Sequence, residues 1–214
     1  MVLVATPPPE RLPSPLFHFL SVGSQIVRIY DPTTHGTTEL TFRFFGPLAR
    51  FDHHRGNHPQ EDLERGVYYA APKFSSCLVE VFGETGVIEI SHKRVCRPQL
   101  TRELRLLDLR GSGAMKAGSV AALAKVADRS LSQAWSRYFY EKQEVYSEID
   151  GIIYYNAHND EEAIVLYERA RNGLTCLSEQ VLPLNDSALL PFIQKVATDN
   201  NLVFDFEANP KGVQ

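Results

Sequence analysis

The sequence predicts a single domain of the α+β class. Its 214 residues are close to the usual size of one domain, and 43% hydrophobic with 22% charged residues is typical of soluble folded proteins. Short segments rich in β-branched residues are interspersed with segments of helical spacing, but without the regular strand–helix rhythm of a doubly wound sheet. We therefore expect a β-sheet core flanked by helices.

The first part of the chain resists regular structure. Five prolines fall within residues 1–24, so we interpret this segment as an extended arm, anchored to the domain by apolar residues between 16 and 20. Residues 25–30 (QIVRIY) and 38–45 (TELTFRFF) predict two strands. Residues 46–66 are polar, with several histidines, and indicate a long loop of the kind that is often functional.

The rest of the chain mixes short apolar strands with helices. We expect strands at residues 66–71, 87–90, 104–109, 151–155, 163–168 and 202–206, and helices at residues 75–82, 114–127, 130–142 and 186–200. No internal repeat or linker divides these elements. We therefore place one domain over residues 25–206, followed by a C-terminal tail at residues 207–214.

Composition argues against several classes of protein. No run approaches the ~18 consecutive apolar residues that a membrane-spanning helix needs. The start, MVLVATPPPERLP, lacks the basic residues and apolar core of a secretory signal. The formal net charge of −4 argues weakly against direct nucleic-acid binding and leaves room for a local basic pocket.

The familiar cofactor and catalytic motifs are missing from the sequence. There is no Walker loop and no GxGxxG, GxSxG or HExxH segment. Cys77, Cys96 and Cys176 have no CxxC spacing, so they form neither a disulfide framework nor a zinc site. We expect structural thiols in a reducing cytoplasm.

Histidines in the long loop raise the question of a metal. Asp52, His53, His54 and His58 could ligate one in principle. Adjacent histidines in a loop that contains proline and glycine are more often solvated. We therefore expect solvated side chains here and no bound metal.

Three charged residues stand in apolar surroundings. Arg28 lies within a β-branched strand, and Arg50 follows the segment FFGP. Glu80 lies in the helical segment CLVEVF, where its neighbours leave little polar face for a carboxylate. Glu80 is either an ordinary exposed helix position or a carboxylate that lines a cleft.

In order along the chain, several segments resemble the RES domain, a family named for an Arg, a Glu and a Ser and found as the toxin of bacterial toxin–antitoxin pairs. VRIY matches the family's first arginine at Arg28, and FGPLARFD matches the second at Arg50. In GVYYAAPKFSSCLVEVFG, Tyr69 precedes Glu80 by the family's eleven positions. RSLSQAWSR carries the family serine at Ser132, and DGIIYYNAHND and AIVLYERA resemble the late strands.

This resemblance covers residues 25 to about 170 and departs from the family in two places. The loop between Arg50 and Tyr69 is longer than in short members, so Arg43 and Arg55 are rivals for the second arginine. The first 24 residues have no counterpart.

Membership would imply a fold like that of the diphtheria-toxin type of ADP-ribosyltransferases, with a twisted β-sheet core flanked by helices. Such toxins cleave the nicotinamide–ribose bond of NAD⁺ with water or inorganic phosphate, and some transfer ADP-ribose to a protein. NAD⁺ would be the substrate, with no further cofactor. The partner would be a helix-turn-helix antitoxin protein, in a homodimer or a toxin–antitoxin hetero-oligomer.

The resemblance also implies a role for each matched residue. Guanidinium groups of Arg28 and Arg50 would grip the pyrophosphate. Glu80 would stabilise the positive charge that develops on the ribose. Tyr69 would stack on the nicotinamide or ribose, unless it is a core tyrosine. Ser132 would orient a ribose or amide group, unless it only serves the start of its helix, a role for which Ser130 is better placed.

Two other functions use the same fold. One is mono-ADP-ribosylation of a protein target, which needs the same residues. The other is an interaction protein that has lost catalysis, against which the complete set of matched residues argues.

Overall fold

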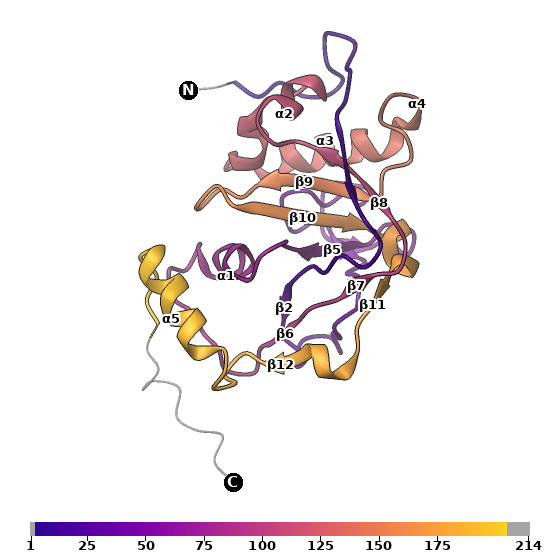
Figure 1. Cartoon of the computed structure of the whole chain (residues 1–214). Helices are drawn as coiled ribbons and strands as arrows, with labels where there is room; N and C mark the ends of the chain where they lie inside the picture. The colour runs from indigo at the N-terminus through magenta and orange to yellow at the C-terminus, as the bar shows by residue number, and fades with distance from the viewer. Residues whose placement is uncertain (1–2, 205–214) are drawn as a thin grey trace.

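The computed structural model describes residues 3–204, which form an α+β domain around a five-stranded mixed sheet (Figure 1). Its neighbouring strands are β1 (Phe17–Leu20), β8 (Leu104–Asp108), β9 (Gly151–Tyr155), β10 (Glu162–Tyr167) and β5 (Val67–Ala70). β8 and β9 are parallel, and the other pairs are antiparallel. The predicted fold class is confirmed.

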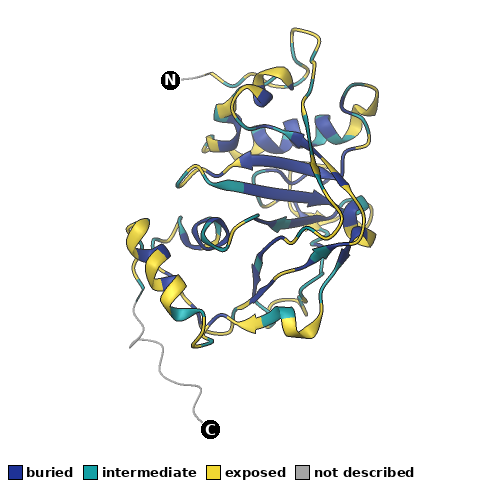
Figure 2. Ribbon diagram, in the orientation of Figure 1, coloured by how far each residue is buried: buried dark blue, intermediate teal, exposed yellow. Residues whose placement is uncertain are grey.

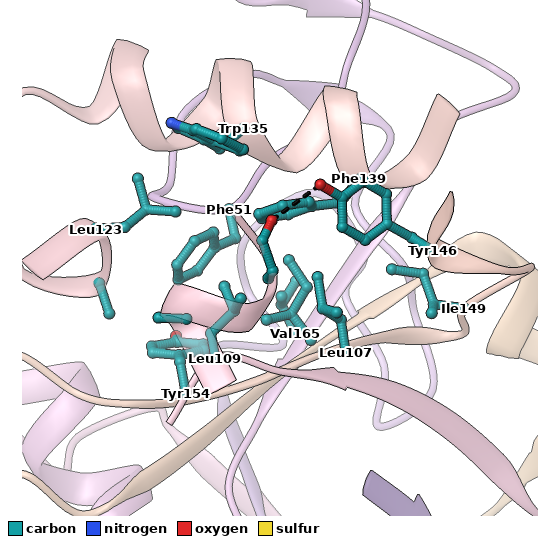
Figure 3. Packing of buried hydrophobic residues seen from close by; sticks show 14 of the residues in the cluster. Phe51, Leu107, Leu109, Leu123, Trp135, Phe139, Tyr146, Ile149, Tyr154 and Val165 are labelled. Atoms are coloured by element: carbon teal, nitrogen blue, oxygen red, sulfur yellow. Dashed lines mark hydrogen bonds between the residues drawn. The ribbon is translucent and has the colours of Figure 1, made fainter. Parts of the chain in front are cut away.

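Because β8 and β9 are parallel, the chain crosses over between them, and this crossover carries helices that cover one face of the sheet. It contains α2 (Ser112–Lys116), the 3₁₀ helix η1 (Ala121–Lys125), α3 (Arg129–Glu141) and α4 (Gln143–Tyr146). Figure 3 shows Trp135 and Phe139 of α3 above the strand residues Leu107 and Val165, all nearly or fully buried. Burial of such side chains contributes roughly 1.5–3 kcal/mol each to stability.

A second, three-stranded sheet joins the far edge of the first. It consists of β12 (Val181–Pro183), β6 (Arg94–Cys96) and β2 (Arg28–Tyr30), and two backbone hydrogen bonds between Val27 and Ala71 connect it to the end of β5. The helices α1 (Phe74–Phe82) and α5 (Leu190–Asp199) pack against it. Figure 2 shows that α5 keeps an exposed outer face.

Short elements complete the described residues. They are β3 (Phe45–Gly46) paired with β4 (Gln60–Glu61), β7 (Gln99–Leu100) paired with β11 (Leu174–Thr175), and the 3₁₀ helices η2 (Glu168–Gly173) and η3 (Ser178–Gln180). None of the helices found within residues 3–204 has the length and hydrophobicity that crossing a membrane requires.

The strand predicted at residues 38–45 is wrong. Thr38 and Thr41 close a turn, in which the Thr41 hydroxyl accepts from the Thr38 amide at 2.9 Å. Threonine hydroxyls compete with strand pairing in this way. Strand geometry is confined to an isolated bridge between Arg43 and Val67 and to the two residues of β3.

The predicted helix at residues 114–127 is broken into α2 and η1. Gly118 lies between them with a φ of +86°, and a Cβ at this position would come within 2.7 Å of Pro9. The positive φ and this close approach favour glycine, and together they end α2.

The N-terminal arm is more ordered than predicted. β1 lies within it and forms the edge of the main sheet beside β8. Farther toward the N-terminus, the Trp135 indole donates to the Ala5 carbonyl at 2.7 Å, so the arm crosses α3.

Two predicted strands, one in the middle of the chain and one near its end, reduce to a single bridge. At residues 87–90 and 202–204, pairing is limited to a parallel bridge between Val87 and Val203. Residues 205–206 and the predicted tail at residues 207–214 lie outside the described residues.

Candidate active site

A cleft of about 470 Å³ is lined by residues of α1, β2, β5 and β9, by the first residue of α3, and by residues of the loops next to these elements. Its charged and aromatic lining consists of Arg50, Tyr69, Glu80, Glu84, Arg129, Tyr154 and His158. Carboxylate, guanidinium and phenol groups therefore meet in one cavity large enough for part of a nucleotide-sized ligand.

Glu80 is half-buried in the wall of this cleft. It is on α1, whose neighbouring residues Leu78, Val79 and Phe82 are buried in the core. Oε1 of Glu80 accepts a hydrogen bond of 3.2 Å from the Tyr154 hydroxyl. Burial raises the pKa of Glu80, and the Tyr154 hydrogen bond partly opposes that rise.

Tyr69 faces the same cleft from β5. Its hydroxyl donates to Oδ1 of Asp52 at 2.9 Å and accepts from the Phe51 amide at 3.0 Å. Successive residues of a strand face opposite sides, so Tyr68 lies on the other face of the sheet, where its hydroxyl donates to the Glu39 carbonyl. Burial raises the pKa of Tyr69 well above its usual value, and the nearby Asp52 adds to the rise.

Asp52 fixes the loop that carries Arg50. Its fully buried carboxylate accepts from the amides of Leu48 at 2.6 Å and Ala49 at 3.0 Å, in addition to Tyr69. Arg43 forms an ion pair with the same carboxylate at 2.8 Å. A buried carboxylate needs such partners, and here they hold the backbone next to Arg50 in place.

Of the three arginines considered for the second position, Arg50 lies in the cleft. Its guanidinium also donates to the Val126 carbonyl just before α3. Arg43 is engaged by Asp52, and Arg55 pairs with Asp62 and Glu64.

The structure does not bring Arg28 into this cleft. Its neighbour Ile29 lines the cavity, so Arg28 faces the opposite side of β2. There its guanidinium donates to the Thr41 carbonyl at 2.7 Å and lies 4.3 Å from the centre of the Tyr68 ring. A cation over an aromatic face is a stable structural arrangement.

Ser132 is fully buried and is also absent from the cleft lining. Its hydroxyl donates to the Arg129 carbonyl at 3.0 Å, within the first turn of α3. The cap of this helix is Asp128, which accepts from the amide and hydroxyl of Ser130, so the expectation that Ser130 caps α3 is wrong.

The prediction that the loop histidines are solvated is wrong for two of them. His53 and His54 are fully buried, while His58 is exposed. Nε2 of His53 lies 2.9 Å from Oε2 of Glu168, and burial lowers the pKa of His53 against the effect of this carboxylate. Within residues 3–204, no three His, Cys, Asp or Glu side chains are grouped to hold a metal ion.

The cysteines are free thiols in the described structure. Cys77 and Cys96 are buried, and Cys176 is half-buried. Cys77 lies in the cleft wall, where burial raises the pKa of its thiol to about 12, so it is a poor nucleophile.

Sequence reasoning missed four of the charged and aromatic residues of the cleft lining: Glu84, Arg129, Tyr154 and His158. Tyr154 had an available signal, because a tyrosine in the apolar segment GIIYY needs a partner for its hydroxyl once buried. The others lie at the exposed ends of elements, where an isolated charge has an ordinary surface explanation.

The family model described as the RES domain matches residues 25–185. No curated protein matches the chain.

Proposed function

The chain belongs to the RES domain family, and on this premise we propose that it cleaves the nicotinamide–ribose bond of NAD⁺. The observation that carries the proposal is the half-buried Glu80 carboxylate, which shares a cleft with Arg50 and Tyr69. In a bacterial cell such a protein acts in the cytoplasm as the toxin of a toxin–antitoxin pair. Cleavage of NAD⁺ makes it toxic, because loss of NAD⁺ arrests growth.

Glu80 supplies the electrostatic part of the reaction. When the nicotinamide–ribose bond breaks, its electron pair leaves with nicotinamide, which becomes neutral and needs no proton. Positive charge develops on the ribose, and an ionised carboxylate in a partly dry cleft stabilises it. Water or phosphate then forms the new bond at the same carbon. When water attacks, it releases one proton to the solvent and the product is ADP-ribose. When phosphate attacks, the product is the phosphate ester of ADP-ribose.

Arg50 and Tyr69 hold the substrate. A guanidinium matches the geometry of phosphate oxygens, and Arg50 is presented by a loop that Asp52 keeps rigid. Tyr69 offers a ring for the ribose or nicotinamide while Asp52 fixes its hydroxyl.

Arg28 and Ser132 act as positioning residues in this proposal. Arg28 packs on the ring of Tyr68, on the face of the sheet that points away from the cleft. Its neighbour in β2, Ile29, lines the cleft. Ser132 secures the first turn of α3, which borders the cleft at Arg129. Both therefore support walls of the cleft without touching the substrate.

The partner we propose is a helix-turn-helix antitoxin that inhibits the enzyme by covering the cleft. An acidic or polar segment of that partner would complement Arg50. The complex is a toxin–antitoxin hetero-oligomer.

The test is to mix the purified protein with NAD⁺, with and without inorganic phosphate, and to identify the products. Free nicotinamide with ADP-ribose indicates hydrolysis, and a phosphorylated ADP-ribose indicates phosphorolysis. Radiolabel from NAD⁺ that remains on added protein indicates ADP-ribosylation instead. If NAD⁺ is unchanged under all conditions, the enzymatic proposal is wrong and the chain is a non-catalytic interaction protein.

A further inference from the structure

The start of α3 brings a second arginine to the cleft beside Arg50. Arg129 lines the cavity, and its Nη1 lies 3.5 Å from the carbonyl oxygen of Leu48, two residues before Arg50. In return, Arg50 donates to the carbonyl of Val126, three residues before Arg129. Each of the two side chains therefore contacts the backbone segment that precedes the other arginine, and both lie at the same end of the cleft.

The charge of Arg129 is only loosely compensated. Its Nη2 forms an ion pair of 2.9 Å with Glu84, in which the two side chains are 49% and 77% exposed. Exposed ion pairs of this kind are weak and exchange readily. Glu84 lies just after α1 and also lines the cleft, so the pair joins two of its walls.

The charge of Arg50 is not compensated by a carboxylate within hydrogen-bonding distance among the described residues. Its partner there is a backbone carbonyl, which carries no net charge. One end of the cleft therefore holds two guanidinium groups and a single carboxylate that can be displaced. A ligand with two adjacent negative charges fits this arrangement better than a neutral or singly charged one.

We propose that Arg129 and Arg50 together bind the diphosphate of the substrate, with a phosphate oxygen replacing the Glu84 carboxylate on Arg129. This inference rests on the proposed cleavage of NAD⁺. It assigns to Arg129 the role that the sequence resemblance implied for Arg28, whose guanidinium lies on the other side of β2.

The first experiment compares two substrates that differ in the diphosphate. Nicotinamide riboside has the same scissile bond as NAD⁺ but no phosphate. With Arg129→Gln, we expect the KM for NAD⁺ to rise roughly 10- to 100-fold, the scale of one charge-assisted contact, while kcat changes little. The KM for nicotinamide riboside stays unchanged, because that substrate never reaches Arg129.

Two further variants sharpen the comparison. Glu84→Gln releases the Arg129 guanidinium, and we expect it to lower the KM for NAD⁺ several-fold. Lys142→Gln is the matched control, because it removes one positive charge from the far end of α3, on a residue that does not line the cleft. It should leave both KM values unchanged.

Binding of ADP, measured by calorimetry, tests the inference without catalysis. We expect the wild type to bind ADP and Arg129→Gln to bind it at least tenfold more weakly. Equal ADP affinity in the two proteins, or no binding to either, would overturn the inference, as would an equal rise in KM for both substrates. A wild type that binds ADP through Arg129 yet leaves NAD⁺ intact would instead overturn the proposed function alone.

Discussion

The Tyr154 hydroxyl donates a hydrogen bond of 3.2 Å to the Glu80 carboxylate, joining β9 to α1 across the floor of the cleft. Burial raises the pKa of Glu80, and this hydrogen bond stabilises the ionised form against that effect. Tyr154 therefore helps to keep ionised the group on which the proposed reaction depends.

Replacing Tyr154 by Phe should shift the pH dependence of NAD⁺ cleavage. Without the donor, the pKa of Glu80 rises further, so the acidic limb of kcat/KM moves to higher pH. We expect the rate at neutral pH to fall roughly tenfold, the scale of one hydrogen bond to a charged group. Tyr155→Phe changes the next residue, which is 39% exposed and does not line the cleft, and should reproduce the wild-type profile. A profile that is the same in all three proteins would contradict the role of Tyr154.

Replacing Glu80 by Gln should stabilise the protein. Because the folded-state pKa of Glu80 is raised, the folded state binds the proton more tightly than the unfolded state. Stability therefore falls as pH rises from the ordinary carboxyl range through the raised pKa. The Gln variant lacks this loss, so it should melt a few degrees above the wild type at pH 7, with a smaller difference at pH 4. A variant that melts lower at pH 7 would show that the carboxylate is not destabilised by burial.

Replacing Asp52 by Asn should be strongly destabilising. The substitution leaves Arg43 without its carboxylate and weakens the bonds to the loop before Arg50. The Arg43 side chain is 31% exposed, so solvent partly compensates its charge, and the expected cost is that of lost hydrogen bonds to a charged group, about 1.5–3 kcal/mol. Asp160→Asn removes the exposed pair with Lys125 and should cost less than about 1 kcal/mol. Urea unfolding measures both, and equal midpoints would refute the proposed importance of Asp52.

The buried His53 should make the protein sensitive to mild acid. Its pKa is lowered by burial in the folded state, so stability is lost as pH falls from the ordinary histidine range through the lowered value. Each such proton changes the unfolding free energy by up to about 1.4 kcal/mol per pH unit. In His53→Gln, which retains a donor for Glu168, the loss between pH 7 and pH 5 should be smaller. His58→Gln alters an exposed residue and should behave as the wild type.

Secondary structure was predictable where the pattern is local. The strands at residues 151–155 and 163–168 pair with each other, and the helix around Glu80 forms as its apolar spacing indicates. The predicted strand at residues 38–45 fails because the Thr38 and Thr41 hydroxyls close a turn. β1 was missed because it depends on β8, a partner almost ninety positions away that local patterns cannot supply.

The same distinction applies to the site. Glu80 stood out because apolar neighbours left it no polar surface, and the structure places it in the cleft. The burial of His53 could not be predicted, since its partner Glu168 is 115 positions away. The orientation of Arg28 follows from which face of β2 packs on Tyr68 of β5, a fact set by tertiary packing.

The most direct test of the account is the comparison of wild type and Glu80→Gln in NAD⁺ turnover and NAD⁺ binding. A charge needed only in the transition state should affect kcat and leave affinity nearly unchanged. We predict a roughly 10²- to 10³-fold lower kcat for Glu80→Gln, with a similar dissociation constant for NAD⁺ by calorimetry. Turnover by Glu80→Gln at the wild-type rate would contradict the central role of this carboxylate.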